Sequence, residues 1–146
     1  MGHIPQGTVW YIAILVYEVK VQGDSRNVVH RNMVLIRADS PEDAYAKALS
    51  QGQEGEIAYK NPAGKLVRIG FRGISELSVV YDELDHGAEL IYEEDVGVTE
   101  EEIEKCLRAK DELRIFRPSE PTAGPDYSSA EVIDDVGRLL TGSSDE

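Results

Sequence analysis

The sequence has very little cysteine and no long hydrophobic run. One cysteine in 146 residues allows neither a disulfide within the chain nor a thiol cluster for a metal. The longest apolar run, residues 9–16, is far shorter than the roughly 20 residues that a membrane-spanning helix needs. The first residues lack the basic start and the small-residue cleavage site of a secretory signal. These absences predict a cytoplasmic protein that has no membrane partner.

Basic residues are scarce as well. The chain has 15 Lys and Arg against 28 Asp and Glu, a net charge of −13. Residues 1–92 carry 12 acidic and 9 basic residues, a net of −3, whereas residues 93–146 carry 16 and 6, a net of −10. Binding of nucleic acid needs clustered Lys and Arg that release counterions, so we expect no nucleic-acid partner. The acidic charge permits a basic protein partner.

Recognisable catalytic and ligand-binding motifs are also missing. The sequence has no Gly-x-Ser-x-Gly nucleophile elbow and no glycine-rich phosphate loop between a strand and a helix. Its three histidines, His3, His30 and His86, do not have the spacing of metal ligands. Its acidic clusters lack the alternating ligands and central glycine of a calcium loop. We therefore expect a non-enzymatic protein with no catalytic residues, no cofactor and no metal site.

What the sequence does have is one strongly apolar stretch, residues 10–39, which predicts a β-hairpin at the centre of a sheet. Residues 9–16 are rich in β-branched and aromatic side chains, which predicts a strand buried on both faces. From Tyr17 onward apolar and polar residues alternate, which indicates burial on one face only. Residues 23–25, Gly-Asp-Ser, suit the turn. The returning strand becomes apolar at residues 33–36, opposite the apolar start of the first.

Residues 40–92 predict one helix and several further strands. Ser40 is a suitable N-cap, Pro41 suits the first helical position, and apolar residues recur at helical spacing as far as a stop at Gly52. Residues 76–84 fit a short helix about as well as a strand, and we prefer the strand. The fold class is therefore α+β, with an antiparallel sheet of about five or six strands around the central hairpin and one helix packed on one face. The expected strands after the helix are residues 56–60, 65–73, 76–84 and 88–92, with turns at 61–64 and 85–87.

The character of the sequence changes after Tyr92. Thr99 and Glu102 form a capping box, which predicts a helix that begins there. Residues 93–146 are richer in acidic residues and less apolar than the first 92. We therefore divide the chain into an α+β sheet domain, residues 1–95, and an acidic C-terminal extension, residues 96–146, with two short helices joined by a proline-rich linker.

The second helix of this extension is the candidate for docking onto a partner. It follows the linker at residues 118–125 and a second capping box at residues 128–131. So short a helix is marginal in water by itself and needs a surface to pack on. That surface would belong to its own sheet, to a second copy of the chain in a homodimer, or to the groove of a foreign protein. Its apolar stripe consists of Val132, Ile133, Val136, Leu139 and Leu140.

Four pieces of the sequence carry a resemblance to a known family. They are WYIAILVYE at residues 10–18, ADSPEDAYAKAL at 38–49, YKNPAGKLVRIGFRGI at 59–74 and YDELDHGAELIY at 81–92. In this order and spacing the chain resembles the bacterial domain-of-unknown-function family numbered 4288, roughly over residues 10–92. The resemblance implies a small bacterial α+β domain with no established activity. It supplies no catalytic residues to carry over.

A second candidate surface lies on the predicted sheet. Arg68 and Arg72 share the non-core face of one strand and could meet an anion, and Trp10 could line a small-ligand groove. The simpler interpretation is that the arginines pair with acidic neighbours and that the tryptophan belongs to the core. We therefore expect a protein–protein interaction or homo-oligomerisation module. The alternatives are an acidic immunity or inhibitor protein that neutralises a basic toxin or nuclease, and a small-ligand-binding domain.

Overall fold

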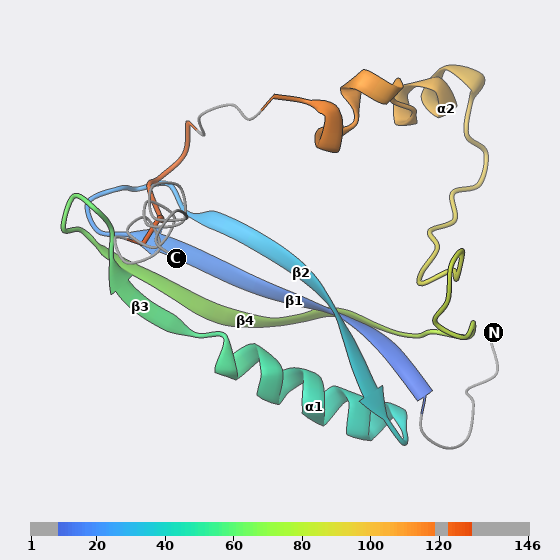
Figure 1. Cartoon of the computed structure of the whole chain (residues 1–146), viewed down its shortest axis with the longest axis horizontal. Coiled ribbons are helices and arrows are strands. Elements are labelled where there is room, and N and C mark those ends of the chain that lie inside the picture. Colours follow the sequence, from blue (N-terminus) through green and yellow to red (C-terminus); the bar gives the residue numbers. More distant parts are fainter. Residues whose placement is uncertain (1–8, 119–122, 130–146) are drawn as a thin grey trace, which may run out of the picture. The chain divides into compact units, whose positions relative to one another are not determined.

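The computed structural model describes residues 9–118 and 123–129 and shows an α+β fold (Figure 1). Of these, residues 9–91 and 124–129 form one compact unit, and residues 92–118 with Ala123 form a second. The first unit contains the whole sheet and its helix. The division predicted from the sequence, at residue 95, stays a prediction.

The sheet has four antiparallel strands in the order β2-β1-β4-β3. They are β1 (Val9–Val21), β2 (Val28–Ala38), β3 (Ile57–Lys60) and β4 (Leu66–Val79). The predicted central hairpin is confirmed, because β1 and β2 pair without interruption from Val9 opposite Ala38 to Val19 opposite Val28. Gly23 takes a φ of 84° in its turn, a conformation that glycine adopts without strain.

The prediction of five or six strands is wrong because two of the expected strands are one. Residues 65–73 and 76–84 were expected to be separate, but β4 runs through both as far as Val79. The pairing of β1 with β4 shifts register twice, and each shift leaves one residue of β4, Arg72 or Ser75, without a partner. Such β-bulges absorb an extra residue and bend the strand while pairing continues. Where a break between two strands was expected, β4 therefore continues through two bulges.

The last predicted strand, residues 88–92, is also wrong. The turn before it does form, since the Ala88 amide donates to the Asp85 carbonyl at 3.0 Å. The next amide, that of Glu89, donates to the carboxylate of Asp82 at 3.0 Å instead of entering a ladder. Residues 80–92 accordingly form turns and irregular structure.

The helix α1 (Pro41–Glu54) begins as predicted but does not end as predicted. The Ser40 hydroxyl accepts a hydrogen bond from the Asp43 amide at 3.0 Å, which confirms the N-cap. The expected stop at Gly52 is wrong, because the helix continues to Glu54. Gly52 instead lets the helix approach the sheet: its carbonyl accepts a hydrogen bond from the Tyr17 hydroxyl at 3.0 Å.

The main core lies between α1 and one face of the sheet, as Figure 1 shows. Alternate β1 residues from Tyr11 to Tyr17 point to this covered face and meet the buried Ala44 and Ala48 of the helix. A smaller core continues along the same face to the hairpin end, around Val19, Val21 and Val67. The opposite face, here called the open face, has no helix packed on it among the described residues.

The second unit contains the helix α2 (Glu100–Cys106) and two short 3₁₀ helices, η1 (Lys110–Glu112) and η2 (Arg114–Phe116). The Thr99 hydroxyl accepts from the Glu102 amide at 3.2 Å, so the predicted N-cap is confirmed. No described helix has the length and hydrophobicity needed to cross a membrane. The second predicted helix lies outside the described residues, with its stripe of Val132, Ile133, Val136, Leu139 and Leu140.

Two buried tyrosines make a matched test of this core. We expect Tyr17→Phe to lower the free energy of unfolding by about 1 kcal/mol, because it removes a buried hydrogen bond to the Gly52 carbonyl, which keeps only the bond from the Gly55 amide at 3.2 Å. Tyr11→Phe should lower it by nothing, since the buried Tyr11 hydroxyl has no hydrogen-bond partner among the described residues. Urea denaturation followed by circular dichroism measures both. Equal losses would mean that the Tyr11 hydroxyl is satisfied too.

Candidate functional site

The structure does not bring the three predicted ligand-face residues together. Trp10 lies opposite Arg37 at the start of β1, whereas Arg68 lies opposite Lys20 near its end. Ten residues of strand separate these positions, roughly 33 Å at about 3.3 Å per residue. Arg72 is a bulge residue of β4 and forms an ion pair with Glu18 at 3.1 Å. The tryptophan and the two arginines therefore cannot line a single small-ligand groove.

A hollow of about 620 Å³ does lie at the hairpin end of the sheet, around Arg68. Most of its charges are already paired within the protein. Glu18 accepts hydrogen bonds from Asn27 at 2.6 Å and from Arg72, and these contacts lower the pKa of its carboxyl, the bond from Asn27 most of all. The residues that line the hollow are Glu18, Lys20, Val21, Gln22, Asp24, Ser25, Arg26, Asn27, Leu66 and Arg68.

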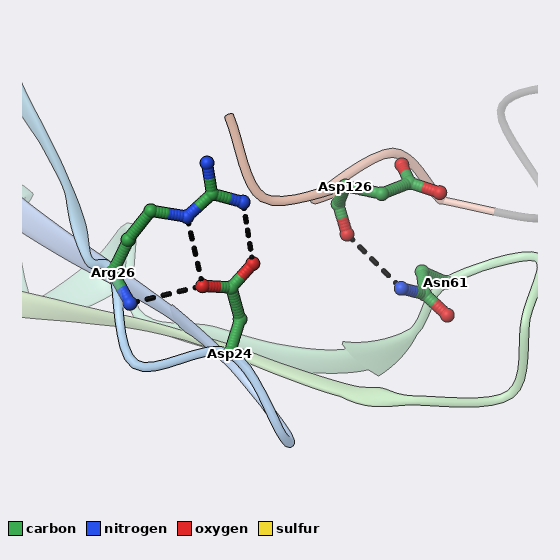
Figure 2. Close-up of polar contacts among 4 residues, drawn as sticks. All are labelled: Asp24, Arg26, Asn61 and Asp126. Carbon is green, nitrogen blue, oxygen red and sulfur yellow. Dashed lines mark hydrogen bonds and ion pairs between the residues drawn. The ribbon is translucent and has the colours of Figure 1, made fainter. Parts of the chain in front are cut away.

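The turn of the hairpin supplies a second internal ion pair to this hollow. The Arg26 guanidinium donates to both oxygens of Asp24, at 3.1 and 2.9 Å, and the Arg26 amide donates to the same carboxylate at 2.9 Å (Figure 2). These bonds hold the pKa of the Asp24 carboxyl below its usual value. Arg68 also lines the hollow, and its guanidinium forms no ion pair with any residue in the described ranges. Small-ligand binding there stays a prediction.

The open face carries an exposed apolar surface along β2. Met33 is 66% exposed and Leu35 is 43% exposed, and they lie opposite Ile14 and Ile12 of β1. Trp10 continues this surface and is 36% exposed. The sequence predicted burial of residues 9–16 on both faces. On the open face only Ile12 of these residues is buried, at 5% exposed, while Ile14 and Val16 are half-buried, so the prediction holds in part. We call Trp10, Met33 and Leu35 the apolar strip.

The strip borders a long free strand edge. The Trp10 carbonyl accepts a hydrogen bond from the Val80 amide, so the backbone N–H and C=O of Trp10 point towards β4. The N–H and C=O of Arg37, the residue opposite on β2, therefore point away from β1, towards the outer edge of the sheet. At this edge the Arg37 carbonyl accepts a hydrogen bond from the Lys47 ammonium of α1 at 2.9 Å. Every second residue before Arg37 points its N–H and C=O the same way, and no described strand pairs with them. These outward residues are Val29, Arg31, Met33 and Leu35.

The other edges of the sheet are less able to pair. The strand β3 has four residues. It covers β4 only from Leu66 to Ile69, and the rest of that edge is broken by the two bulges. Bulges and short edge strands are devices that hinder pairing between chains. Among the described edges, β2 is the long, regular one, with 11 residues and no proline.

One further contact, which pattern reasoning missed, joins the end of the chain to the sheet. The Asn61 side chain is 4% exposed and donates to the Asp126 carbonyl at 3.0 Å (Figure 2). The sequence assigned Asn61 to a turn and Asp126 to the region after the linker. The two are 65 residues apart, and no local pattern signals such a contact.

The described part of the chain has neither a group of metal-ligating side chains nor a buried thiol. No three His, Cys, Asp or Glu side chains in those residues are grouped so that they could hold a metal ion. Cys106 is exposed, and its thiol donates to the Glu102 carbonyl one turn earlier at 3.4 Å.

Comparison with known proteins agrees with the resemblance read from the sequence. The model of a family described as Domain of unknown function (DUF4288) matches residues 10–92. This match covers the sheet, α1 and the turns after β4, which is more than half of the chain. The chain belongs to this family. No match is found among curated proteins or among solved structures. The DUF4288 region thus contains both the apolar strip and the free β2 edge.

Proposed function

We propose that this DUF4288 protein is a protein–protein interaction module that forms a homodimer through the β2 edge. The observation that supports this most is the combination of a free, regular 11-residue edge strand with exposed Met33 and Leu35. A row of unpaired N–H and C=O groups is a template for another strand, and natural proteins protect such edges unless they use them. Here proline, bulges and a covering strand are all absent from β2 in the described residues.

The second copy is favoured as the occupant because β2 can pair with itself. In an antiparallel two-fold arrangement centred on Met33, Arg31 lies opposite Leu35 of the second copy, and Val29 lies opposite its Arg37. No two like charges then lie directly opposite one another. Residues 28–38 contain no Asp or Glu, so the strong acidic charge of the chain is kept off this edge.

Lys47 sets one end of the pairing. Its ammonium occupies the outward carbonyl of Arg37, so that position is already satisfied within the monomer. In this register the outward groups that are free on both copies are those of Arg31, Met33 and Leu35, which is enough for a short intermolecular ladder. The apolar side chains of Met33 and Leu35 would contribute by leaving water.

Proline at position 33 tests the proposal because it removes an outward N–H and the exposed Met33 side chain, both of which the proposed dimer uses. That N–H is not used in pairing with β1, and edge strands accept proline where the N–H faces solvent. We expect wild type to dimerise in sedimentation equilibrium and Met33→Pro to raise the dissociation constant at least tenfold. Met33→Lys, which keeps the N–H but adds a charge, should also weaken the dimer.

The control is Tyr45→Lys. Tyr45 is 52% exposed on α1, so the substitution removes a comparable exposed apolar side chain elsewhere. It should leave the dissociation constant unchanged. A wild type that stays monomeric at every concentration would overturn the proposal, and so would a Tyr45→Lys protein that loses the dimer as Met33→Pro does.

A further inference from the structure

The hairpin end of the covered face holds residues 124–129, here called the strap. Two neighbouring side chains bind its backbone: the Tyr59 hydroxyl donates to the Tyr127 carbonyl, and the Asn61 amide donates to the Asp126 carbonyl at 3.0 Å. The carbonyls of residues 126 and 127 thus accept hydrogen bonds from β3 and from the turn that follows it. The strap accepts these bonds through its backbone, as a bound peptide segment does.

Asn61 is positioned for this contact by its own turn. Its side-chain oxygen accepts from the amides of Ala63 at 3.1 Å and Lys65 at 2.9 Å. These two bonds are local, so they fix the direction of the side-chain N–H groups whether or not the strap is bound. A donor prepared in this way binds with a smaller entropy cost than a mobile one.

A side chain of the strap also packs against apolar residues of the sheet. The Tyr127 ring packs with the small core of Val19, Val21 and Val67, and its edge meets the His30 ring at a centroid distance of 5.3 Å. Pro125 is buried too. The buried Pro125 and the half-buried Tyr127 therefore anchor the strap on either side of Asp126.

Asp126 shapes the peptide rather than binding the sheet with its carboxylate. That carboxylate accepts from the Ser128 amide at 3.1 Å and from the Ser128 hydroxyl. An Asp side chain bonded two residues ahead makes an Asx-turn, which fixes the direction of the chain after Tyr127. The residues that contact the sheet or shape the strap are therefore Pro-Asp-Tyr-Ser, residues 125–128.

Receptor and strap belong to different parts of the chain. Tyr59, Asn61 and His30 lie within the family region, residues 10–92, whereas the strap lies beyond it and follows the separate unit of residues 92–123. The receptor does not depend on strap residues for its strands, all of which end by Val79. This separation is the arrangement of a domain and a ligand segment joined by a long connection.

We propose that this end of the sheet is a peptide-binding site for a Pro-Asp-Tyr-Ser segment, and that a partner protein presenting this sequence displaces the chain's own residues 125–128. The proposal concerns a different surface from the β2 edge and does not depend on dimerisation. The cis segment acts as a competitor at an effective concentration of at most about a millimolar, because its connection to the sheet is long. A partner therefore binds best when the strap is weakened.

Fluorescence anisotropy with a labelled Gly-Pro-Asp-Tyr-Ser-Ser peptide tests the proposal on the full chain. We expect Tyr127→Ala, which removes the strap's ring anchor, to bind the peptide at least tenfold more tightly than wild type does. Adding Tyr59→Phe, which removes a donor to the peptide backbone, should weaken this binding about fivefold. A peptide with Ala in place of Tyr should bind at least tenfold more weakly to Tyr127→Ala.

Two results would overturn the proposal: Tyr127→Ala binding the peptide no better than wild type, or binding the Ala peptide equally well. Circular dichroism first shows whether Tyr127→Ala is folded. If it is not, wild type is titrated with excess unlabelled peptide and followed by NMR. The amide signals of Tyr127 and Ser128 should then move to free-peptide positions while the Tyr59 and Asn61 signals stay. Signals that do not move would count against the proposal.

Discussion

Leu15→Ala is expected to lower the free energy of unfolding by about 3 kcal/mol, the range found when a fully buried leucine is truncated. Leu15 is 1% exposed in the middle of β1, where it points to the covered face and joins the core that α1 closes. Its strand neighbours are Asn32 of β2 and Ile74 of β4, so little can move in to fill the space. Urea denaturation followed by circular dichroism measures the loss.

Val16→Ala is the matched control on the next residue of the same strand. Its side chain points to the open face, where it is half-buried. The loss should stay below about 1 kcal/mol, because less apolar area leaves contact and the surroundings can adjust. Equal losses at positions 15 and 16 would mean that the open face is covered as fully as the other, contrary to the structure.

Gly52→Val is expected to cost about 3 kcal/mol of stability, at the upper end for overpacking a core. A Cβ atom at Gly52 would lie 2.4 Å from the Phe71 ring, which itself packs against Tyr17 at a centroid distance of 5.6 Å. The helix would have to move away from the sheet, and the hydrogen bond from the Tyr17 hydroxyl to the Gly52 carbonyl would then lengthen. Thermal or urea unfolding reports the combined loss.

Gly70→Ala is the control for this substitution. A Cβ atom at Gly70 meets nothing closer than the Glu56 carboxylate at 3.8 Å, an ordinary contact distance. Stability should change by less than about 0.5 kcal/mol, as for other substitutions at uncrowded sites. If Gly52→Val unfolds at the same urea concentration as wild type, the close approach of α1 to the sheet is not real.

Local signals predicted the elements that depend on neighbouring residues. The Ser40 and Thr99 caps, the central hairpin and β3 were all predicted correctly, because each depends on chemistry within a few positions: a side-chain oxygen and an amide three residues on, or a turn and its flanking alternation. The α+β class followed from these elements, and so did the placing of one helix on the sheet.

Three of the errors came from contacts between distant residues. Gly52 looked like a helix stop but is the point where the helix touches Tyr17, 35 residues earlier. The break expected after Gly73 is a bulge, because β4 keeps pairing with β1 on both sides of it. Trp10 looked like part of a ligand groove, and the pairing of the strands places it at the far end of β1 from Arg68.

The sequence by itself determined the class of the fold, its family, the hairpin and the beginnings of both described helices. Only the tertiary structure decided the long-range features of the described residues: a sheet of four strands, one face that α1 leaves open, and a β2 edge with no strand paired to it. It also decided that Asp126 and Tyr127 dock 65 or more residues from their partners. The physical reason is that caps and turns are satisfied by near neighbours. Strand order, open faces and long-range docking depend instead on which apolar surfaces meet once the elements have formed.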